Sequence, residues 1–116
     1  MRQSYRNGEL VNIDLGKPPG EIKGHEQAFQ RPCAIIRSFS NLSLVIIIPL
    51  TTKQPQYGLY TIVKIPKGSG GLNEDSYALC HQIRTVSFDR ILNKIGQLEN
   101  KDFLKIKTVL LDTLEL

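Results

Sequence analysis

The chain is 116 residues long and carries a formal net charge of +4, from 15 Lys and Arg residues against 11 Asp and Glu residues. This length predicts a single domain over residues 1–116, with a core that buries roughly two-thirds of the surface exposed by the unfolded chain. It excludes a second independent domain. The positive charge is compatible with a polyanionic partner, although many proteins of similar charge bind no nucleic acid.

The apolar runs predict neither a membrane span nor an export signal. The longest, Leu44 to Leu50, is far shorter than the roughly 20 residues that cross a bilayer, and residues 1–6 lead directly into a strand pattern. Cys33 and Cys80 both lie in apolar, strand-like runs. We therefore expect a reduced, cytoplasmic protein whose two cysteines are small core residues.

A first strand is predicted over residues 8–15, GELVNIDL, which ends in turn-forming residues. Residues 16–24 form a predicted loop, because the three glycines and two prolines of GKPPGEIKG cannot continue a ladder. Loops of this length are often functional. A polar cluster, His25-Glu26-Gln27, leads from the loop towards the next strand.

The strongest apolar signal lies between Arg31 and Thr52 and predicts a β-hairpin. β-branched residues form two short runs, separated by turn-forming residues at 39–42. If the turn is centred near Asn41, opposed positions keep a constant index sum, so that 31 pairs with 51, 33 with 49 and 35 with 47. Arg31 then faces Thr51 with Cβ atoms about 4.5–5.5 Å apart, and a guanidinium and a hydroxyl converge at the open end of the hairpin.

Two further strands are predicted after the hairpin, over residues 60–65 and 76–85, with a glycine-rich loop between them. Strict alternation along the second strand places Gln82 and Arg84 on one face and His81 on the other. Gln82 and Arg84 are therefore expected to act together.

The last part of the chain predicts a helical turn at residues 88–93, a short closing strand at 95–98 and a C-terminal helix capped by Asn100. One face of this helix carries Phe103, Ile106, Leu110 and Leu114 at helical spacing. Five or six strands followed by one amphipathic helix indicate a mainly β, α+β fold. We expect a strongly bent antiparallel sheet or small, partly open barrel with the helix packed against it.

Several short motifs follow one another along the chain, namely Gly8-Glu9-Leu10-Val11, Asp14-Leu15, Gly24-His25-Glu26-Gln27, Arg31-Pro32, Pro49-Leu50-Thr51, Gln82-Ile83-Arg84-Thr85 and Lys94-Ile95-Gly96. In this order they resemble the MazF/PemK family of toxin–antitoxin ribonucleases. The resemblance extends from about Gly8 to Leu114. It implies an SH3-like barrel, a homodimer, single-stranded RNA as the substrate, cleavage without a metal ion or other cofactor, and neutralisation by an acidic antitoxin.

The resemblance also implies roles for particular residues. Arg31 and Thr51 match the catalytic arginine and threonine of the family, in agreement with the pairing expected from the hairpin. Positions that shape or contact RNA are matched by Glu26, Gln27, Gln82 and Arg84, and we add the neighbouring His25 and Thr52 as candidate RNA contacts. Residues 16–24 form a longer loop than is usual in the family.

The residue types fit the chemistry of RNA cleavage. RNA carries its own nucleophile, the 2′-hydroxyl, so an enzyme need only align it with the phosphorus and stabilise the developing charge. Arg31 can supply that charge and a fork of donors, and Thr51 can offer a hydroxyl. The resemblance implies products with 2′,3′-cyclic phosphate and 5′-hydroxyl ends. Arginine is a credible acid and a strained base, so Glu26 and His25 are candidates for the general base, and the assignment stays open.

Structural roles compete with each functional assignment. An arginine before a proline at the start of a strand, such as Arg31, is also typical of a solvated surface charge. Arg84 could equally be the structural partner of an ion pair inside the barrel. His81 stands where many members of the family carry an acidic residue, and we expect a packed or surface histidine there. Cys33, Cys80 and the two histidines lack the spacing of a zinc site, so we expect no bound metal.

Three functions remain open at this point. The leading one is a metal-independent toxin endoribonuclease of a toxin–antitoxin system. The second is a CcdB-like toxin that binds a topoisomerase and leaves RNA uncut. The third is a plain nucleic-acid-binding barrel, for which four Phe, four Tyr and no Trp provide few stacking platforms. Leu104 and Leu111, off the main apolar stripe of the helix, are candidate dimer contacts, with the alternative that they only widen the face that meets the core.

Overall fold

The computed structural model describes residues 4–16, 30–57 and 59–116. These residues form seven strands, four short 3₁₀ helices and one α-helix. The strands are β1 (Glu9–Asp14), β2 (Gln30–Phe39), β3 (Leu44–Thr51), β4 (Ile62–Ile65), β5 (Ser76–Leu79), β6 (Arg84–Ser87) and β7 (Ile91–Gln97). The 3₁₀ helices are η1 (Leu59–Thr61), η2 (Ser69–Gly71), η3 (Cys80–Gln82) and η4 (Phe88–Arg90), and the α-helix is α1 (Asn100–Thr113). Among these described residues, no helix is both long and apolar enough to cross a membrane.

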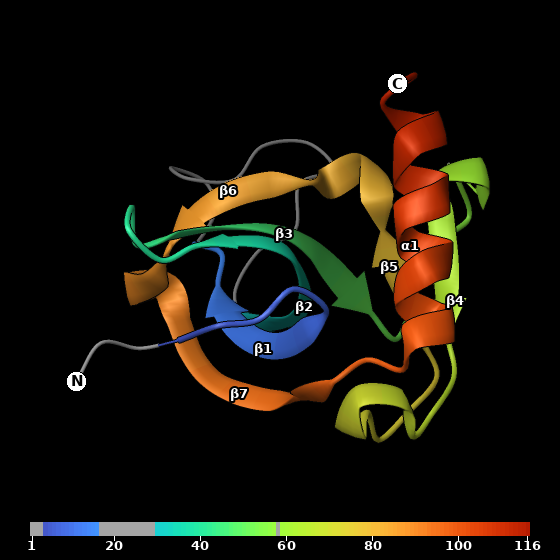
Figure 1. The fold of residues 1–116 in the computed structure, drawn as a ribbon. Helices are drawn as coiled ribbons and strands as arrows, with labels where there is room; N and C mark the ends of the chain where they lie inside the picture. Colours follow the sequence, from blue (N-terminus) through green and yellow to red (C-terminus); the bar gives the residue numbers. More distant parts are fainter. Residues whose placement is uncertain (1–3, 17–29, 58) are drawn as a thin grey trace.

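The strands form one antiparallel sheet in the order β4-β5-β3-β2-β1-β7, with β6 pairing to β3 outside this path. β3 divides its length between two neighbours, since Leu44 to Ile47 pair with β6 whereas Leu50 and Thr51 pair with β5. A strand with two partners along one edge bends the sheet. Figure 1 shows the result, a strongly curved sheet with α1 standing beside β4 at one end. The expected bent antiparallel sheet with a C-terminal helix is confirmed.

The β2–β3 hairpin has the expected register between its β-bulge and its open end. Cys33 lies opposite Pro49 and Ile35 opposite Ile47, which is the constant sum predicted from a turn near residue 41. The register changes by one after Ile35, where the ladder contains a β-bulge. The bulge lies on the turn side of Ile35 and leaves the expected register intact from Ile35–Ile47 to Cys33–Pro49.

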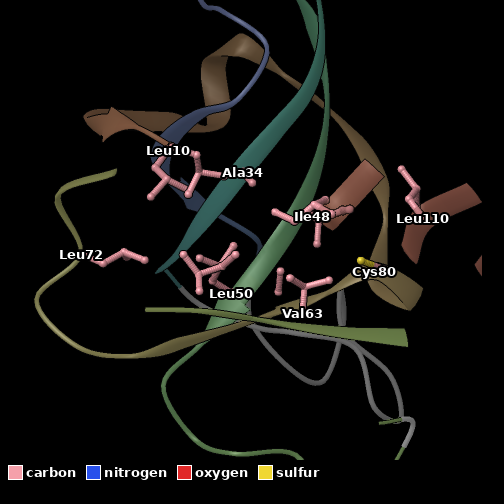
Figure 2. Close-up of a cluster of buried hydrophobic side chains, with 12 residues drawn as sticks. Leu10, Ala34, Ile48, Leu50, Val63, Leu72, Cys80 and Leu110 are labelled. Atoms are coloured by element: carbon pink, nitrogen blue, oxygen red, sulfur yellow. The ribbon is translucent and has the colours of Figure 1, made fainter. Parts of the chain in front are cut away.

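Both faces of the hairpin are buried, which explains its nearly continuous apolar sequence. Alternate residues of β2 and β3 contribute to two hydrophobic clusters. The first contains Ala34, Ile48, Leu50, Cys80 and residues Ile106 and Leu110 of α1, and Figure 2 shows several of these side chains converging between the strands and the helix. The second contains Val11, Ile13, Cys33, Ile35, Val45, Ile47 and Val86 on the other face.

The prediction of one strand over residues 76–85 is wrong. The chain forms β5, then the 3₁₀ helix η3 at Cys80–Gln82, then β6. This division raises the strand count to seven in the described residues, from the five or six expected. The sequence gives no local warning, because residues 79–84 contain neither Gly nor Pro; the break follows from tertiary pairing, since β5 and β6 must reach different parts of β3.

Three boundaries also differ from expectation. The predicted helical turn at 88–93 is confirmed only for η4, and the remainder belongs to β7, which pairs with β1. Residues 60 and 61 lie in η1 rather than in a strand. Asn100 is the first helical residue and not the cap, because Glu99 has the extended cap conformation and its carbonyl accepts from the backbone N–H groups of Asp102 and Phe103.

The predicted apolar stripe of α1 is confirmed at its centre. Ile106 and Leu110 are buried in the core and Phe103 packs against it. Leu114 is 44% exposed, however, because the helix ends at Thr113 and Leu114 is its C-terminal cap. The stripe therefore contacts the core over two turns rather than three.

Candidate functional site

Arg31 and Thr51 lie at the open end of the β2–β3 hairpin, and both are half-buried. Arg31 pairs with Ile13 of β1 on one side of β2. On the other side, continuing the register of Cys33 and Pro49 by two residues brings Arg31 level with Thr51. Since opposed residues share a face, both side chains stand on the face of the sheet that carries Cys33.

Arg84 lies on the same face, on the neighbouring strand β6. It pairs with Ile47, which in turn pairs with Ile35, so these three side chains form one row across the sheet. Burial raises the pKa of the Cys33 thiol to about 12, and the positive charges of Arg84 and Arg31 act against this rise. The positive charges of both arginines therefore act on one buried thiol, with Arg31 two residues before it on β2 and Arg84 in the row of Ile35 on its other side.

A hollow of about 590 Å³ has Thr51, the residue level with Arg31, in its wall, and neither Arg31 nor Arg84 is among its lining residues. It lies between the end of β3, the connection that follows it, η1 and η3. Its lining residues are Thr51, Lys53, Gln54, Pro55, Gln56, Tyr57, Tyr60, Thr61, Leu79, His81 and Gln82. We call this hollow the groove.

Gln82 lines the groove together with Thr51, as the functional interpretation requires, but His81 lines it too. The prediction that His81 and Gln82 occupy opposite faces is wrong because they belong to η3. Alternation over two residues is a property of strands, whereas a 3₁₀ helix turns about 120° per residue. His81 is exposed within the groove, and its Nδ1 lies 2.7 Å from Thr61 Oγ1.

The remaining predicted RNA contacts are not found among the described residues of the groove wall. Thr52 is exposed and is not among the residues that line the groove. It lies at the apex of a tight turn in which the backbone N–H of Lys53 donates to Thr51 Oγ1 over 3.2 Å. His25, Glu26 and Gln27 lie outside the described residues.

Sequence reasoning missed two aromatic side chains and one histidine of the groove. Tyr57 and Tyr60 are each 80% exposed, and both line the groove. For Tyr57 the available signal was its position in the polar connection after the hairpin, because an aromatic ring in such a loop has no role in a core. Tyr60 was instead assigned to the start of the strand predicted over residues 60–65. His81 had no such signal, because its placement depends on η3.

The described residues contain no group of three or more His, Cys, Asp or Glu side chains able to hold a metal ion. Cys33 and Cys80 are free and buried, and burial raises the pKa of the Cys80 thiol to about 11. Both thiols are therefore protonated at neutral pH, which removes them as nucleophiles. In the described part of the chain, the groups that remain at the site are guanidinium, ammonium, hydroxyl, amide, imidazole and phenol.

Comparison with known proteins gives matches over nearly the whole chain. The family model for the PemK-like, MazF-like toxin of type II toxin–antitoxin systems matches residues 6–114. A curated relative, the endoribonuclease MazF of Staphylococcus saprophyticus, is 28% identical over 108 residues, which cover 90% of this chain and 87% of the relative.

Solved structures show the same fold at low sequence identity. A mycobacterial endoribonuclease in complex with its cognate antitoxin superposes with a TM-score of 0.75 at 21% identity, over 97% of each chain. MazF from Deinococcus radiodurans superposes with a TM-score of 0.74 at 19% identity, over 94% of each chain. Since the family model spans all but a few terminal residues, this chain belongs to the PemK-like, MazF-like toxins of type II toxin–antitoxin systems.

Proposed function

We propose that this toxin is an endoribonuclease that cleaves single-stranded RNA where Arg31 and Thr51 meet, using the RNA 2′-hydroxyl as the nucleophile. The observation that carries the proposal is the hairpin register, which aligns an arginine with a threonine at the edge of the groove. Its support from relatives is the endoribonuclease activity named for the curated match.

The site supplies what phosphoryl transfer to a neighbouring hydroxyl requires. Arg31 offers a permanent positive charge and a planar fork of donors to the non-bridging phosphate oxygens, where charge develops in the transition state. Thr51 offers its hydroxyl to the same phosphate. Arg84 adds a second positive charge on the same face, so the phosphate is drawn to this end of the groove.

The groove suits an unpaired strand. Tyr57 and Tyr60 offer exposed rings on which bases can stack, and such stacking is typical of single-strand recognition. Gln54, Gln56 and Gln82 offer amides that donate and accept hydrogen bonds at base edges. A paired duplex keeps its bases stacked and holds its backbone away from the in-line geometry that attack by the 2′-hydroxyl needs.

The decisive experiment is cleavage of a long, unstructured RNA by the purified toxin in EDTA. We expect cleavage without added metal and 2′,3′-cyclic phosphate and 5′-hydroxyl ends at each cut. A substrate with a 2′-deoxy nucleotide at the mapped position is the matched control, since it lacks only the nucleophile. Cleavage that disappears in EDTA and returns with Mg²⁺, or cleavage of the deoxy substrate, would contradict the mechanism.

The alternative of a CcdB-like toxin that binds a topoisomerase finds no support among the matches, which are PemK- and MazF-like toxins. A supercoiling assay with purified DNA gyrase separates the two functions directly. We expect no inhibition of gyrase at toxin concentrations that cleave RNA completely.

The partner of this site is an acidic antitoxin segment, which we propose lies across the groove and competes with RNA. A basic groove that accepts phosphates also accepts carboxylates interleaved with apolar anchors. We further propose a homodimer, for which α1 offers Leu104 and Leu111, which are 60% and 54% exposed. We also propose that the toxin acts in the cytoplasm, where its RNA substrate is found.

Titration of the antitoxin tail, followed by cleavage rate and by light-scattering mass, tests the shared groove and the homodimer. A monomeric mass would overturn the homodimer, and a tail that binds together with RNA would overturn the shared groove.

A further inference from the structure

One row of side chains crosses four strands at the open end of the β2–β3 hairpin. Thr51 of β3 pairs with Tyr77 of β5, and Tyr77 pairs with Lys64 of β4. On the other side of Thr51 the row continues to Arg31, which is level with it on β2. Directly opposed residues share a face, with Cβ atoms about 4.5–5.5 Å apart. Tyr77 is therefore the direct neighbour of Thr51 on β5, and Lys64 is the direct neighbour of Tyr77 on β4.

The adjacent row shows which face of the sheet this one occupies. Leu50, Ala78 and Val63 are paired in the same way, and all three are buried in the first hydrophobic cluster. Figure 2 shows Leu50 and Val63 within this cluster. Because side chains alternate along a strand, the row that contains Thr51 points away from the cluster and from α1, which packs on it.

The row carries groups that bind phosphate. Thr51 and Tyr77 are half-buried and offer hydroxyl groups, whereas Lys64 is exposed and offers an ammonium group. Arg31, at the other end, is half-buried and carries a guanidinium group. Lysine, arginine, threonine and tyrosine are all among the side chains that contact nucleic-acid phosphates. The row therefore places two hydroxyl groups between two positively charged residues.

The width of the row determines how many phosphates it can meet. Neighbouring strands lie about 4.8 Å apart, so the three spacings from β2 to β4 separate the backbones of Arg31 and Lys64 by about 14 Å. Side chains stand roughly perpendicular to a sheet, which keeps the two charges apart. If the scissile phosphate is held at Arg31 and Thr51, Lys64 is placed to meet the phosphate of a neighbouring nucleotide.

Lys64 is paired with a carboxylate that orients it. Its Nζ lies 3.7 Å from Asp75 Oδ2, and both side chains are more than half exposed. Asp75 is itself fixed, because its Oδ1 accepts the backbone N–H of Lys67 over 2.8 Å. An exposed ion pair of this length contributes little free energy, so a phosphate can replace the carboxylate at small cost.

We propose that Tyr77 and Lys64 form a second phosphate subsite of this toxin, an inference that rests on the proposed ribonuclease function. The scissile phosphate lies at Arg31 and Thr51. The phosphate of a neighbouring nucleotide accepts a hydrogen bond from the Tyr77 hydroxyl and displaces the Asp75 carboxylate from the Lys64 ammonium group. Both contacts are made to the RNA backbone, so they hold the strand across the sheet whatever its base sequence.

The first test measures the affinity for a single-stranded RNA with a 2′-deoxy nucleotide at the mapped cut site, which binds without being cleaved. On a single strand, each phosphate contact adds about 0.7 to the steepness with which the logarithm of affinity falls with the logarithm of salt concentration. Lys64→Gln should weaken binding by up to about fivefold and lower this slope by about 0.7. Asp75→Asn should tighten binding by up to about fivefold, since it releases Lys64 while its amide oxygen still accepts from Lys67.

A second exposed ion pair controls for the change in net charge. Lys101 Nζ lies 3.5 Å from Glu99 Oε2, and both side chains are more than half exposed. This pair lies at the N-terminus of α1, on the other side of the sheet from the row. Lys101→Gln and Glu99→Gln should therefore bind the RNA as the unmodified protein does. Equal effects in the two pairs would show that net charge alone acts and would overturn the subsite.

The second test removes the Tyr77 hydroxyl and keeps the ring. In Tyr77→Phe we expect KM to rise roughly two- to tenfold, as for the loss of one hydrogen bond, with little change in kcat. The factor should be the same at every cut site of a long RNA, because a phosphate contact carries no sequence information. A fall in Tm with unchanged KM would show a purely structural hydroxyl and remove Tyr77 from the subsite.

The outcomes separate the subsite from the proposed function. If the unmodified protein cleaves RNA and Lys64→Gln keeps both its affinity and its salt slope, the subsite is overturned while the ribonuclease function stands. If the unmodified protein cleaves no RNA, the proposed function fails and the subsite fails with it.

Discussion

Two buried serines offer a matched test of how charge controls the stability of this fold. Ser69 and Ser76 are each 3% exposed, so Ser→Ala removes the same buried hydroxyl at both positions. Ser69 Oγ donates to Asp102 Oδ2 over 2.6 Å, whereas Ser76 Oγ donates to the carbonyl of Glu74 over 3.1 Å. The two variants therefore differ in whether the acceptor that loses its donor is a carboxylate or a neutral carbonyl. Ser69→Ala also removes the acceptor of the Glu99 backbone N–H, a longer contact of 3.4 Å.

The expected magnitudes follow from these partners. Asp102 is fully buried, and its Oδ1 has no hydrogen-bond partner among the described residues. Ser69→Ala therefore removes the hydrogen bond to Oδ2 and leaves neither carboxylate oxygen with a donor from these residues. Hydrogen bonds to charged groups contribute about 1.5–3 kcal/mol to the free energy of unfolding, and neutral ones about 0.5–1.5 kcal/mol. With roughly 4 °C per kcal/mol for a chain of this size, we expect Tm to fall by about 9 °C in Ser69→Ala and about 4 °C in Ser76→Ala.

Thermal unfolding followed by circular dichroism measures both shifts. The protein concentration must be equal in all samples, because association of subunits would raise Tm with concentration. Equal losses in the two variants, or a larger loss in Ser76→Ala, would show that the charge of the acceptor does not govern the cost and would refute the reasoning.

Three further predictions concern the groove and its surroundings. Arg31→Ala and Thr51→Ala should each lower kcat by roughly 10²-fold or more, and Arg31→Lys should recover only part of the rate because a lysine lacks the planar fork of donors. The fold should persist, with a small fall in Tm for Thr51→Ala, which loses the acceptor of the Lys53 N–H. Kinetics at the unmodified rate would refute both roles. Gln82→Ala should alter which sequences are cut, as read by end mapping of a long RNA, more than it lowers the total rate; uniform loss at every site would assign it to chemistry instead. Cys33 and Cys80 should resist iodoacetamide at pH 8 in the folded protein and react fully in urea, because burial raises both thiol pKa values to about 11–12 and keeps the thiols protonated; rapid labelling of the native protein, read by mass spectrometry, would contradict their burial.

The hairpin was predictable because its sequence constrains it at several levels. Two runs of β-branched residues, a polar turn and a constant index sum all specify the same pairing, and the structure has that pairing at Cys33–Pro49 and Ile35–Ile47. The alignment of Arg31 with Thr51 follows from that register. Its catalytic role remains a prediction for the kinetics to test.

The groove was less predictable, because it depends on contacts between distant parts of the chain. The sequence does not indicate η3, because residues 76–85 have the pattern expected of a single strand. The break arises because β5 and β6 pair with different parts of β3. The bond from Thr61 to His81 spans 20 residues and joins two 3₁₀ helices that local propensity does not indicate. The sequence therefore allowed single residues to be chosen as candidates, but it did not show which of them line the groove together.

The short link η3 also determines where relatives of this chain can differ in length. β5 and β6 are anchored to the same strand β3 at fixed pairs, Leu50 with Ala78 and Ile47 with Arg84. One inserted residue between these anchors would shift the register of β6 and turn Arg84 to the opposite face of the sheet. The exposed turn at residues 40–43 connects strands that already pair, so it can lengthen without moving either arginine. Insertions and deletions should therefore accumulate at such turns during evolution and be selected against at Cys80–Gln82.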